Sequence, residues 1–252
     1  MVVRRCFIAC GFISFLTIGC GDLTISSSEI TKQVVQESNV TQLLTEVEDS
    51  QKAKNLLNQG NNFLDTNRYK EALASYNQAI SLKTDSVETW VNRGNALIAL
   101  HRYEEALESY EKAIALQPNK DEAWYNRGNA LTALHRYEDA VKAYDEAIAI
   151  QSNKDEAWIN RGIALTKLRR YKEALASYNQ AISLKPNLHQ AYYNKACNYA
   201  LQNNVELALE NLEKAIQFVP EKYISLAKTD SDFDKIRNDQ RFQELLASKT
   251  SR

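Results

Sequence analysis

The sequence predicts an all-α fold in which pairs of helices repeat and stack into an α-solenoid. Three observations lead to this prediction. Tryptophan recurs at Trp90, Trp124 and Trp158, with a constant spacing of 34 residues. The string RYKEALASYNQAISLK occurs twice, starting at Arg68 and at Arg170, and these starts differ by 102 residues, three times 34. The 252 residues include only 7 Gly and 3 Pro, too few for the turns of a β-rich fold.

The first twenty residues have the features of an export signal. Arg4 and Arg5 precede an apolar run of twelve residues, 7–18, which is too short to span a bilayer core of about 30 Å. This run ends in Gly19 and Cys20, and the segment resembles the lipobox of bacterial lipoproteins. That resemblance implies that 1–19 is a signal peptide and that Cys20 is the site of lipid attachment.

An ordinary cleaved signal or an uncleaved N-terminal anchor is the alternative interpretation of this segment. Thr17 occupies the place where lipoproteins prefer Leu. If the chain is cleaved before Cys20 and Cys20 carries lipid, Cys6 and Cys10 are removed and only Cys197 keeps a free thiol, so no intramolecular disulfide would be possible.

Residues 20–52 are predicted to be a tether between this anchor and the folded repeats. They begin with polar residues and show little apolar periodicity, apart from a short helix expected near 40–47.

The repeats themselves are predicted to occupy 53–222. Apolar and small residues recur every three or four positions in two segments of each repeat, the pattern of two amphipathic helices. The turn within a unit is expected at Asn67-Arg68 and its equivalents, and the turn between units at Pro118, Pro186 and Pro220. The five units are 53–86, 87–120, 121–154, 155–188 and 189–222.

Small and aromatic residues occupy matching places in these units, and the pattern closely resembles the tetratricopeptide repeat. Position 8 is Gly60, Gly94, Gly128, Gly162 and Ala196; position 20 is alanine throughout; position 24 is Tyr76, Tyr110, Tyr144, Tyr178 and Leu212. The resemblance implies a right-handed superhelix in which the first helix of each pair lines a concave groove. A stack of this kind needs an end that water can solvate, so 223–252 is predicted to form C-terminal capping helices, or alternatively a partner-binding tail.

The resemblance places asparagines in the groove, at position 6 (Asn58, Asn92, Asn126, Asn160 and Asn194) and at position 9 (Asn61, Asn95 and Asn129). An amide offers both a donor and an acceptor, so this ladder could bind the backbone of an extended peptide. The alternative is that duplication of the unit has copied an asparagine used only in packing. Position 5 adds Leu57, Val91, Tyr125, Ile159 and Tyr193, a mostly apolar strip that includes favoured interface anchors.

Charged residues narrow the choice of ligand. Glu88, Glu122 and Glu156, at position 2, would make one wall acidic. Glu122 and Asn126 stand where chaperone co-factors with such repeats carry basic residues, so binding of an acidic chaperone tail is not expected. Arginines at position 7 (Arg93, Arg127 and Arg161) could bind an anion, but charge pairs with neighbouring units are the preferred interpretation.

The sequence contains no catalytic or metal-binding motif and predicts no enzyme, cofactor or metal site. Cys197 is expected to be a small packed residue. The net charge of −1, with basic residues spread along the chain, predicts no nucleic-acid partner. We therefore expect an exported, lipid-anchored scaffold on a bacterial membrane face that binds a protein or peptide. A pilotin-like assembly factor and a self-associating, homo-oligomeric structural scaffold are the alternatives.

Overall fold

The computed structural model describes residues 27–83 and 85–248, and the predicted signal peptide and Cys20 lie outside them. The chain divides into two compact units, Met1–Val47 and Glu48–Arg252. Helix α1 (Ser27–Asp65) begins in the first unit and continues into the second. No helix of the described residues is both long enough and apolar enough to span a membrane.

The predicted tether is far more helical than expected. Instead of a short helix near 40–47, α1 runs without interruption from Ser27. The segment 27–59 contains no Gly or Pro, so nothing in it ends a helix. Weak apolar periodicity was a misleading signal here, because a helix whose sides are largely exposed needs no apolar stripe.

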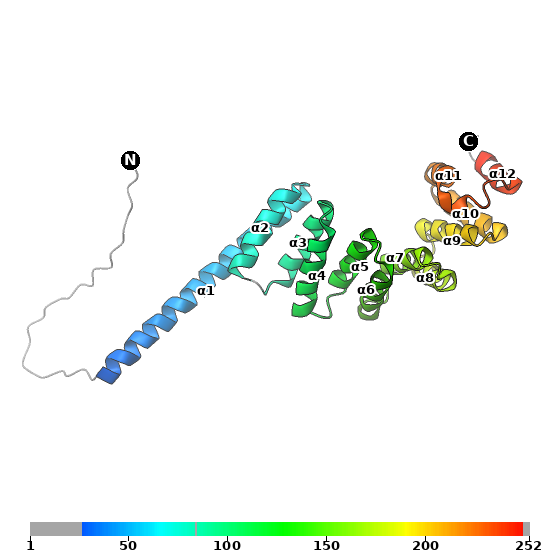
Figure 1. The fold of residues 1–252 in the computed structure, drawn as a ribbon. Coiled ribbons are helices and arrows are strands. Elements are labelled where there is room, and N and C mark those ends of the chain that lie inside the picture. Colours follow the sequence, from blue (N-terminus) through cyan, green and yellow to red (C-terminus); the bar gives the residue numbers. More distant parts are fainter. Residues whose placement is uncertain (1–26, 84, 249–252) are drawn as a thin grey trace, which may run out of the picture. The chain divides into compact units, whose positions relative to one another are not determined.

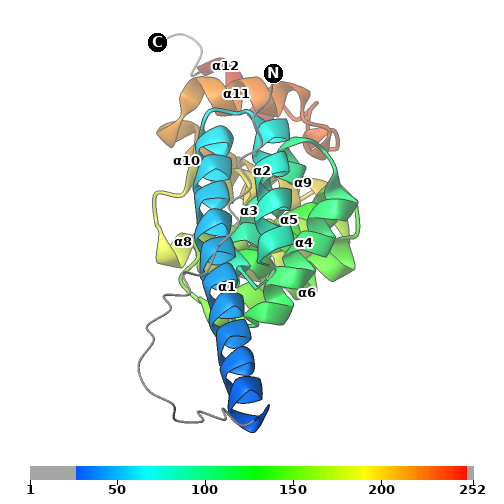
Figure 2. The same cartoon turned by 90° about the vertical axis from the view of Figure 1, so that its left-hand side faces the viewer.

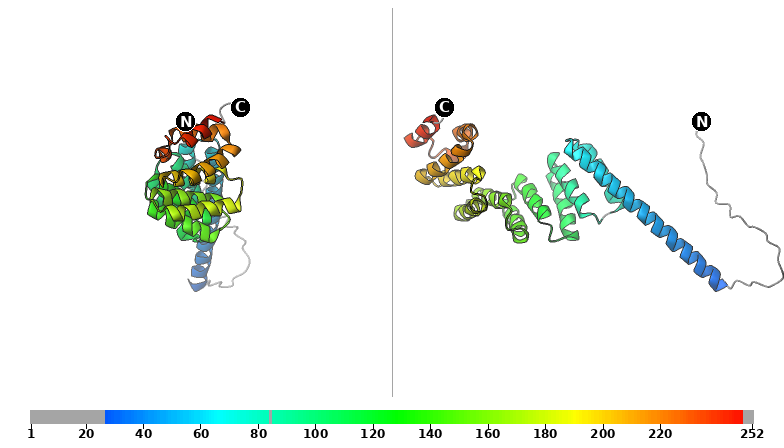
Figure 3. Two further views of the ribbon diagram at one scale, coloured as in Figure 1. Left: turned by 90° about the vertical axis from the view of Figure 1, so that its right-hand side faces the viewer. Right: turned by 180° about the vertical axis from the view of Figure 1, so that it is seen from behind.

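The second unit is an α-solenoid of helical hairpins (Figure 1). The hairpins after α1 and α2 (Tyr69–Leu82) are formed by α3 (Val87–Ala99) with α4 (Tyr103–Leu116), α5 (Asp121–Ala133) with α6 (Tyr137–Ile150), α7 (Asp155–Lys167) with α8 (Tyr171–Leu184), and α9 (His189–Leu201) with α10 (Val205–Phe218). Each hairpin packs on the next, and first helices contact one another from α3 to α9 (Figures 2 and 3). All regular elements in the described residues are helical.

The turn inside each hairpin lies where the sequence predicts it. Asn67, His101, His135, Arg169 and Asn203 all adopt a left-handed backbone conformation, with φ between 57° and 59°. The turn is closed by two hydrogen bonds, as when the N–H of Arg102 donates to the carbonyl of Leu97 and that of His101 to Ile98. This is the Schellman arrangement, which usually has Gly at the left-handed position.

The two helices of a hairpin approach closely because the residues between them are small. The alanines at position 20 (Ala72, Ala106, Ala140, Ala174 and Ala208) are 0% exposed. The glycines at position 8 face the tyrosines at position 24, and a Cβ atom added to Gly128 would lie 2.5 Å from Cε1 of Tyr144. Each tyrosine ring therefore fills the space that the missing side chain leaves.

The C-terminal residues pack on the fifth hairpin, as predicted for capping helices. They form α11 (Pro220–Thr229), the short 3-10 helix η1 (Ser231–Phe233) and α12 (Gln240–Ser248). Tyr223, Phe233, Ile236 and Phe242 are each no more than 1% exposed and join the core of α9 and α10. They thus cover the apolar surface that the fifth hairpin would otherwise expose.

Candidate functional site

The candidate site is the surface formed by the first helices of the hairpins, from residue 53 of α1 through α3, α5, α7 and α9. We refer to it as the first-helix face. It carries the asparagines of positions 6 and 9, and most of them are half-buried, between core and solvent.

The asparagines of successive units are hydrogen-bonded to one another. The side-chain oxygen (Oδ1) of each position 9 asparagine accepts two hydrogen bonds. One comes from the position 24 tyrosine hydroxyl of the same unit, and the other from the side-chain nitrogen (Nδ2) of the position 6 asparagine in the next unit. The three sets are Tyr76–Asn61–Asn92, Tyr110–Asn95–Asn126 and Tyr144–Asn129–Asn160, with every donor–acceptor distance 2.8 or 2.9 Å. These six asparagines therefore have a packing function, since the bonds link the first four units to one another in turn.

The same amides retain bonding capacity at the surface. Asn92, Asn126 and Asn160 each use the amide nitrogen in the ladder, and their carbonyl oxygens make no hydrogen bond among the described residues. At the ends of the ladder, Asn58 and Asn194 make no side-chain hydrogen bond within the described chain. Packing and ligand binding are thus compatible uses of this ladder, because an amide has more than one donor and acceptor.

The position 5 residues of the predicted apolar strip differ in their accessibility. Val91 and Tyr193 are 2% and 7% exposed and pack between helices, whereas Leu57, Tyr125 and Ile159 line the hollows described below, although Ile159 is only 8% exposed. Tyr193 is covered by the cap, because its hydroxyl donates to Oδ2 of Asp230 at 2.8 Å and its ring stacks on Tyr223.

Tyr125 is the most accessible aromatic residue of the strip. It is half-buried, and its hydroxyl oxygen accepts a hydrogen bond from the Asn160 amide at 3.1 Å. The ammonium of Lys154 lies 4.9 Å from the centre of its ring, a cation–π contact.

Two hollows open on the first-helix face. The first hollow, of about 570 Å³, lies between α1 and α3 and is lined by Lys54, Lys83 and Asp85 among others. The second hollow, of about 490 Å³, lies between α7 and α9 and brings together Asp155, Glu156 and the predicted ladder residues Asn160 and Asn194. Basic side chains thus outnumber acidic ones in the lining of the first hollow. In the lining of the second hollow, the two carboxylates outnumber the single lysine, Lys185.

The position 7 arginines are used within the solenoid. Arg127 pairs with Glu111 at 3.5 Å and Arg161 with Asp145, each in the preceding unit, as preferred from the sequence. Arg93 differs, because Asn77 occupies the equivalent place and accepts its hydrogen bond at 2.8 Å. Each guanidinium also lies about 5.8–5.9 Å from the tryptophan ring of its own unit.

Two of the three glutamates in the predicted acidic wall already interact with other side chains. Glu88 accepts a weak hydrogen bond from Asn61 at 3.4 Å, and Glu122 pairs with Lys120 at 3.3 Å. Glu156 is exposed and lines the second hollow.

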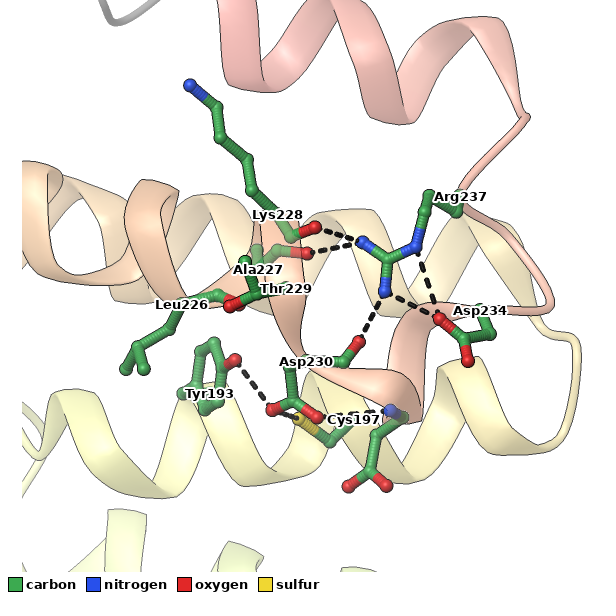
Figure 4. Close-up of polar contacts among 10 residues, drawn as sticks. Tyr193, Cys197, Leu226, Ala227, Lys228, Thr229, Asp230, Asp234 and Arg237 are labelled. Carbon is green, nitrogen blue, oxygen red and sulfur yellow. Dashed lines mark hydrogen bonds and ion pairs between the residues drawn. The ribbon is translucent and has the colours of Figure 1, made fainter.

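Cys197 is buried, as predicted, but the sequence did not predict which residues surround it. The thiol lies 3.7 Å from Oδ2 of Asp230, and burial followed by the charges of Asp230 and Asp232 raises the pKa of Cys197. A raised thiol pKa makes it a poor nucleophile. Figure 4 shows that the Asp230 side chain, at the end of α11, contacts Tyr193 and Cys197 of α9. The sequence signal for this contact was the Asp-Ser-Asp-Phe run that follows α11, which suits a capping turn.

Comparison with known proteins agrees with this architecture. Family models of the tetratricopeptide repeat match residues 60–100, 94–134, 121–154, 155–188 and 189–221. These matches together cover more than half of the chain. The chain therefore belongs to the tetratricopeptide-repeat family.

Among solved structures, YrrB is 28% identical, with a TM-score of 0.61 over 72% of this chain and 92% of YrrB. It is described as a TPR protein with an unusual peptide-binding site. The crystal structure of MamA is 23% identical, with a TM-score of 0.61 over 65% of this chain and 95% of MamA. MamA from Desulfovibrio magneticus RS-1, residues 41 to the end, gives a TM-score of 0.64 at 20% identity, covering 68% of this chain and 97% of that one. No curated protein sequence matches the chain.

Proposed function

We propose that this protein is a non-enzymatic scaffold that binds an extended peptide segment of another protein on its first-helix face. The observation that carries the proposal is the row of amides with unused donors and acceptors beside two hollows. Such groups can replace the hydrogen bonds that a peptide backbone makes with water. The similarity to YrrB, which has a peptide-binding site, supports the same mode of recognition.

We further propose that Cys20 carries lipid and holds the scaffold at an exported membrane face of a bacterial cell. The basis is the sequence of residues 1–20 alone. A Cys20→Ala variant should lose incorporation of a clickable fatty acid and leave the membrane fraction, whereas Cys6→Ala should retain both. Labelling of the Cys20→Ala variant would contradict this anchor.

Peptide binding is best tested with asparagines that do not hold the solenoid together. Changing Asn92, Asn126 and Asn160 to Ala would remove the inter-unit hydrogen bonds and confuse binding with folding. Asn58 and Asn194 make no such bonds, so Asn58→Ala with Asn194→Ala should leave the unfolding midpoint unchanged.

The experiment places a photo-crosslinking residue at Tyr125 of the full-length protein in cells and identifies the adducts. A discrete protein adduct that is strongly reduced by Asn58→Ala with Asn194→Ala is expected. Asn153→Ala with Asn179→Ala is the matched control, since both are exposed and lie outside the first helices, Asn153 in the turn before α7 and Asn179 in α8. Adducts that are indifferent to the test pair would contradict groove recognition, and adducts only with a second copy would favour a self-associating scaffold.

A further inference from the structure

The aspartate at the second hollow is paired differently from the equivalent aspartate of the third unit. In the third unit, Lys154 at position 34 donates to Oδ2 of Asp121 at position 1, with a distance of 2.8 Å. In the fourth unit, position 1 is again an aspartate, Asp155, but position 34 is Leu188. The side chain of Leu188 has no hydrogen-bond donor, and Oδ2 of Asp155 is buried without any hydrogen-bond partner in the described chain.

The nearest cation does not replace the missing lysine. The ammonium of Lys185 lies 3.8 Å from Oδ2 of Asp155, beyond hydrogen-bonding distance, and this side chain is 56% exposed. A buried carboxylate oxygen without a donor is rare in native proteins and calls for an explanation. Asp155 is also the first residue of α7, where the helix dipole favours a negative charge.

The asparagine ladder is interrupted at the same place. In the fourth unit, position 9 is Ile163 and not asparagine, so the amide of Asn194 lacks the acceptor that Asn92, Asn126 and Asn160 have. Ile163 lines the second hollow together with Asn194. Leu188 therefore leaves the Asp155 carboxylate without the lysine that bonds to Asp121, and Ile163 leaves the Asn194 amide without the acceptor that the preceding ladder amides have, around one hollow.

The chemistry of the hollow favours a long cationic side chain. Asp155 and Glu156 provide two negative charges and Lys185 one positive charge, while Ile159 and Ile163 provide apolar wall. Lysine and arginine combine an apolar stem with a cationic end, and so match both parts. An acidic side chain would instead be repelled by Asp155 and Glu156.

We propose that the second hollow binds a lysine or arginine side chain of the bound peptide, and that Asp155 is the residue that recognises its charge. This inference rests on the proposed function, because it names the side chain that the peptide presents. The stem lies along Ile159 and Ile163, and the cation displaces the exposed Lys185 from its long ion pair with the Asp155 carboxylate. The Asn194 amide is available to a backbone group of the same residue.

The test uses the full-length chain in detergent and a phage-displayed library of random dodecapeptides. We select the peptides that are enriched by the wild-type protein but not by the variant that combines Asn58→Ala with Asn194→Ala. Each selected peptide is then synthesised with its basic residues replaced in turn by norleucine. Norleucine keeps the apolar stem of the side chain and removes the charge. Affinities are measured by fluorescence anisotropy for wild type, for the nearly isosteric variant Asp155→Asn, and for the matched control Asp121→Asn, whose carboxylate is already paired with Lys154.

A basic residue shared by the enriched peptides is expected, with binding at least tenfold weaker for Asp155→Asn and unchanged for Asp121→Asn. The norleucine peptide should bind wild type and Asp155→Asn equally, because the charge pair is absent in both. Enriched peptides without a basic preference, or equal losses for the two aspartate variants, would overturn the inference while leaving peptide binding intact. Failure to enrich any peptide would contradict the proposed function itself, and this inference with it.

Discussion

At the scale of the residue, the pairing of glycine with tyrosine determines how closely the two helices of a hairpin pack. Gly60, Gly94, Gly128 and Gly162 each leave space for a tyrosine ring from the second helix. The fifth hairpin has Ala196 and Leu212 at these places, both 0% exposed. A larger residue on one helix thus accompanies a smaller one on the other, as close packing requires.

This pairing predicts the outcome of a double-mutant cycle. Gly128→Ala should destabilise the protein by about 2 kcal/mol, because its Cβ would overlap the Tyr144 ring. Tyr144→Leu should also destabilise it, through the cavity and the lost hydrogen bond to Asn129. The double variant should be less destabilised than the sum, since Leu leaves room for the methyl group. Urea denaturation provides the free energies of unfolding.

The control for this cycle combines Gly128→Ala with Tyr76→Leu, which belongs to the first hairpin and faces Gly60. Its two effects should simply add, because distant sites are independent. Additivity in the Gly128–Tyr144 pair as well would show that the close approach does not govern packing there.

At the scale of the element, a single guanidinium group bonds to several carbonyl groups of the C-terminal cap. Arg237 donates to the carbonyl oxygens of Ala227, Lys228 and Asp230 at the end of α11, and pairs with Asp234 at 2.6 Å (Figure 4). The last carbonyls of a helix have no partner within it, so these bonds satisfy groups that would otherwise need water. The planar guanidinium suits this role because it directs several N–H groups at once.

Replacing Arg237 should therefore loosen the cap. Arg237→Ala is expected to cost about 2 kcal/mol, the magnitude of hydrogen bonds to a charged group, and Arg237→Lys nearly as much, because an ammonium cannot bond to the same set of carbonyls. Hydrogen exchange should increase first in α11 and α12. Arg241→Ala is the control, because Arg241 is 56% exposed and, within the part of the chain that the structure describes, pairs only with Asp239. Equal exchange in Arg237→Ala and Arg241→Ala would contradict this role.

At the scale of the whole molecule, buried tyrosines run through the hairpins and the cap. Burial is the largest cause that raises the pKa of Tyr76, Tyr110, Tyr144, Tyr178 and Tyr193 above the ordinary value, and it raises the pKa of Tyr223 to about 12. An ionised phenol is costly to bury, so the native state holds these groups in the neutral form.

Because the pKa values of these tyrosines are higher in the native state than in the unfolded state, we expect the protein to unfold in alkali. The unfolded state releases phenolic protons near pH 10 and the native state only at higher pH, so the stability from these tyrosines is complete below about pH 10 and is lost as the pH rises above it. Far-UV circular dichroism and tyrosinate absorbance should change together in one steep transition. Ionisation at the ordinary pKa with no loss of helix would show that these hydroxyls are accessible in the native state.

Much of the fold could be predicted from the sequence, for a local reason. The 34-residue period, the small residues and the turn residues act within one hairpin, so the sequence alone determined the hairpins, their turns and the cap. It did not determine the extent of α1, because a helix with exposed sides leaves no periodic signal.

The site was predicted in position but not in detail, because its details depend on neighbouring units. Only the tertiary structure decided that Asn92 bonds to Asn61 of the preceding unit and that Val91 and Tyr193 are buried. It also decided that Asp155 lacks a donor, which depends on Leu188 lying where the equivalent lysine reaches Asp121. Local periodicity specifies which face of a helix is apolar, whereas burial and hydrogen bonding depend on what the next helix places against that face.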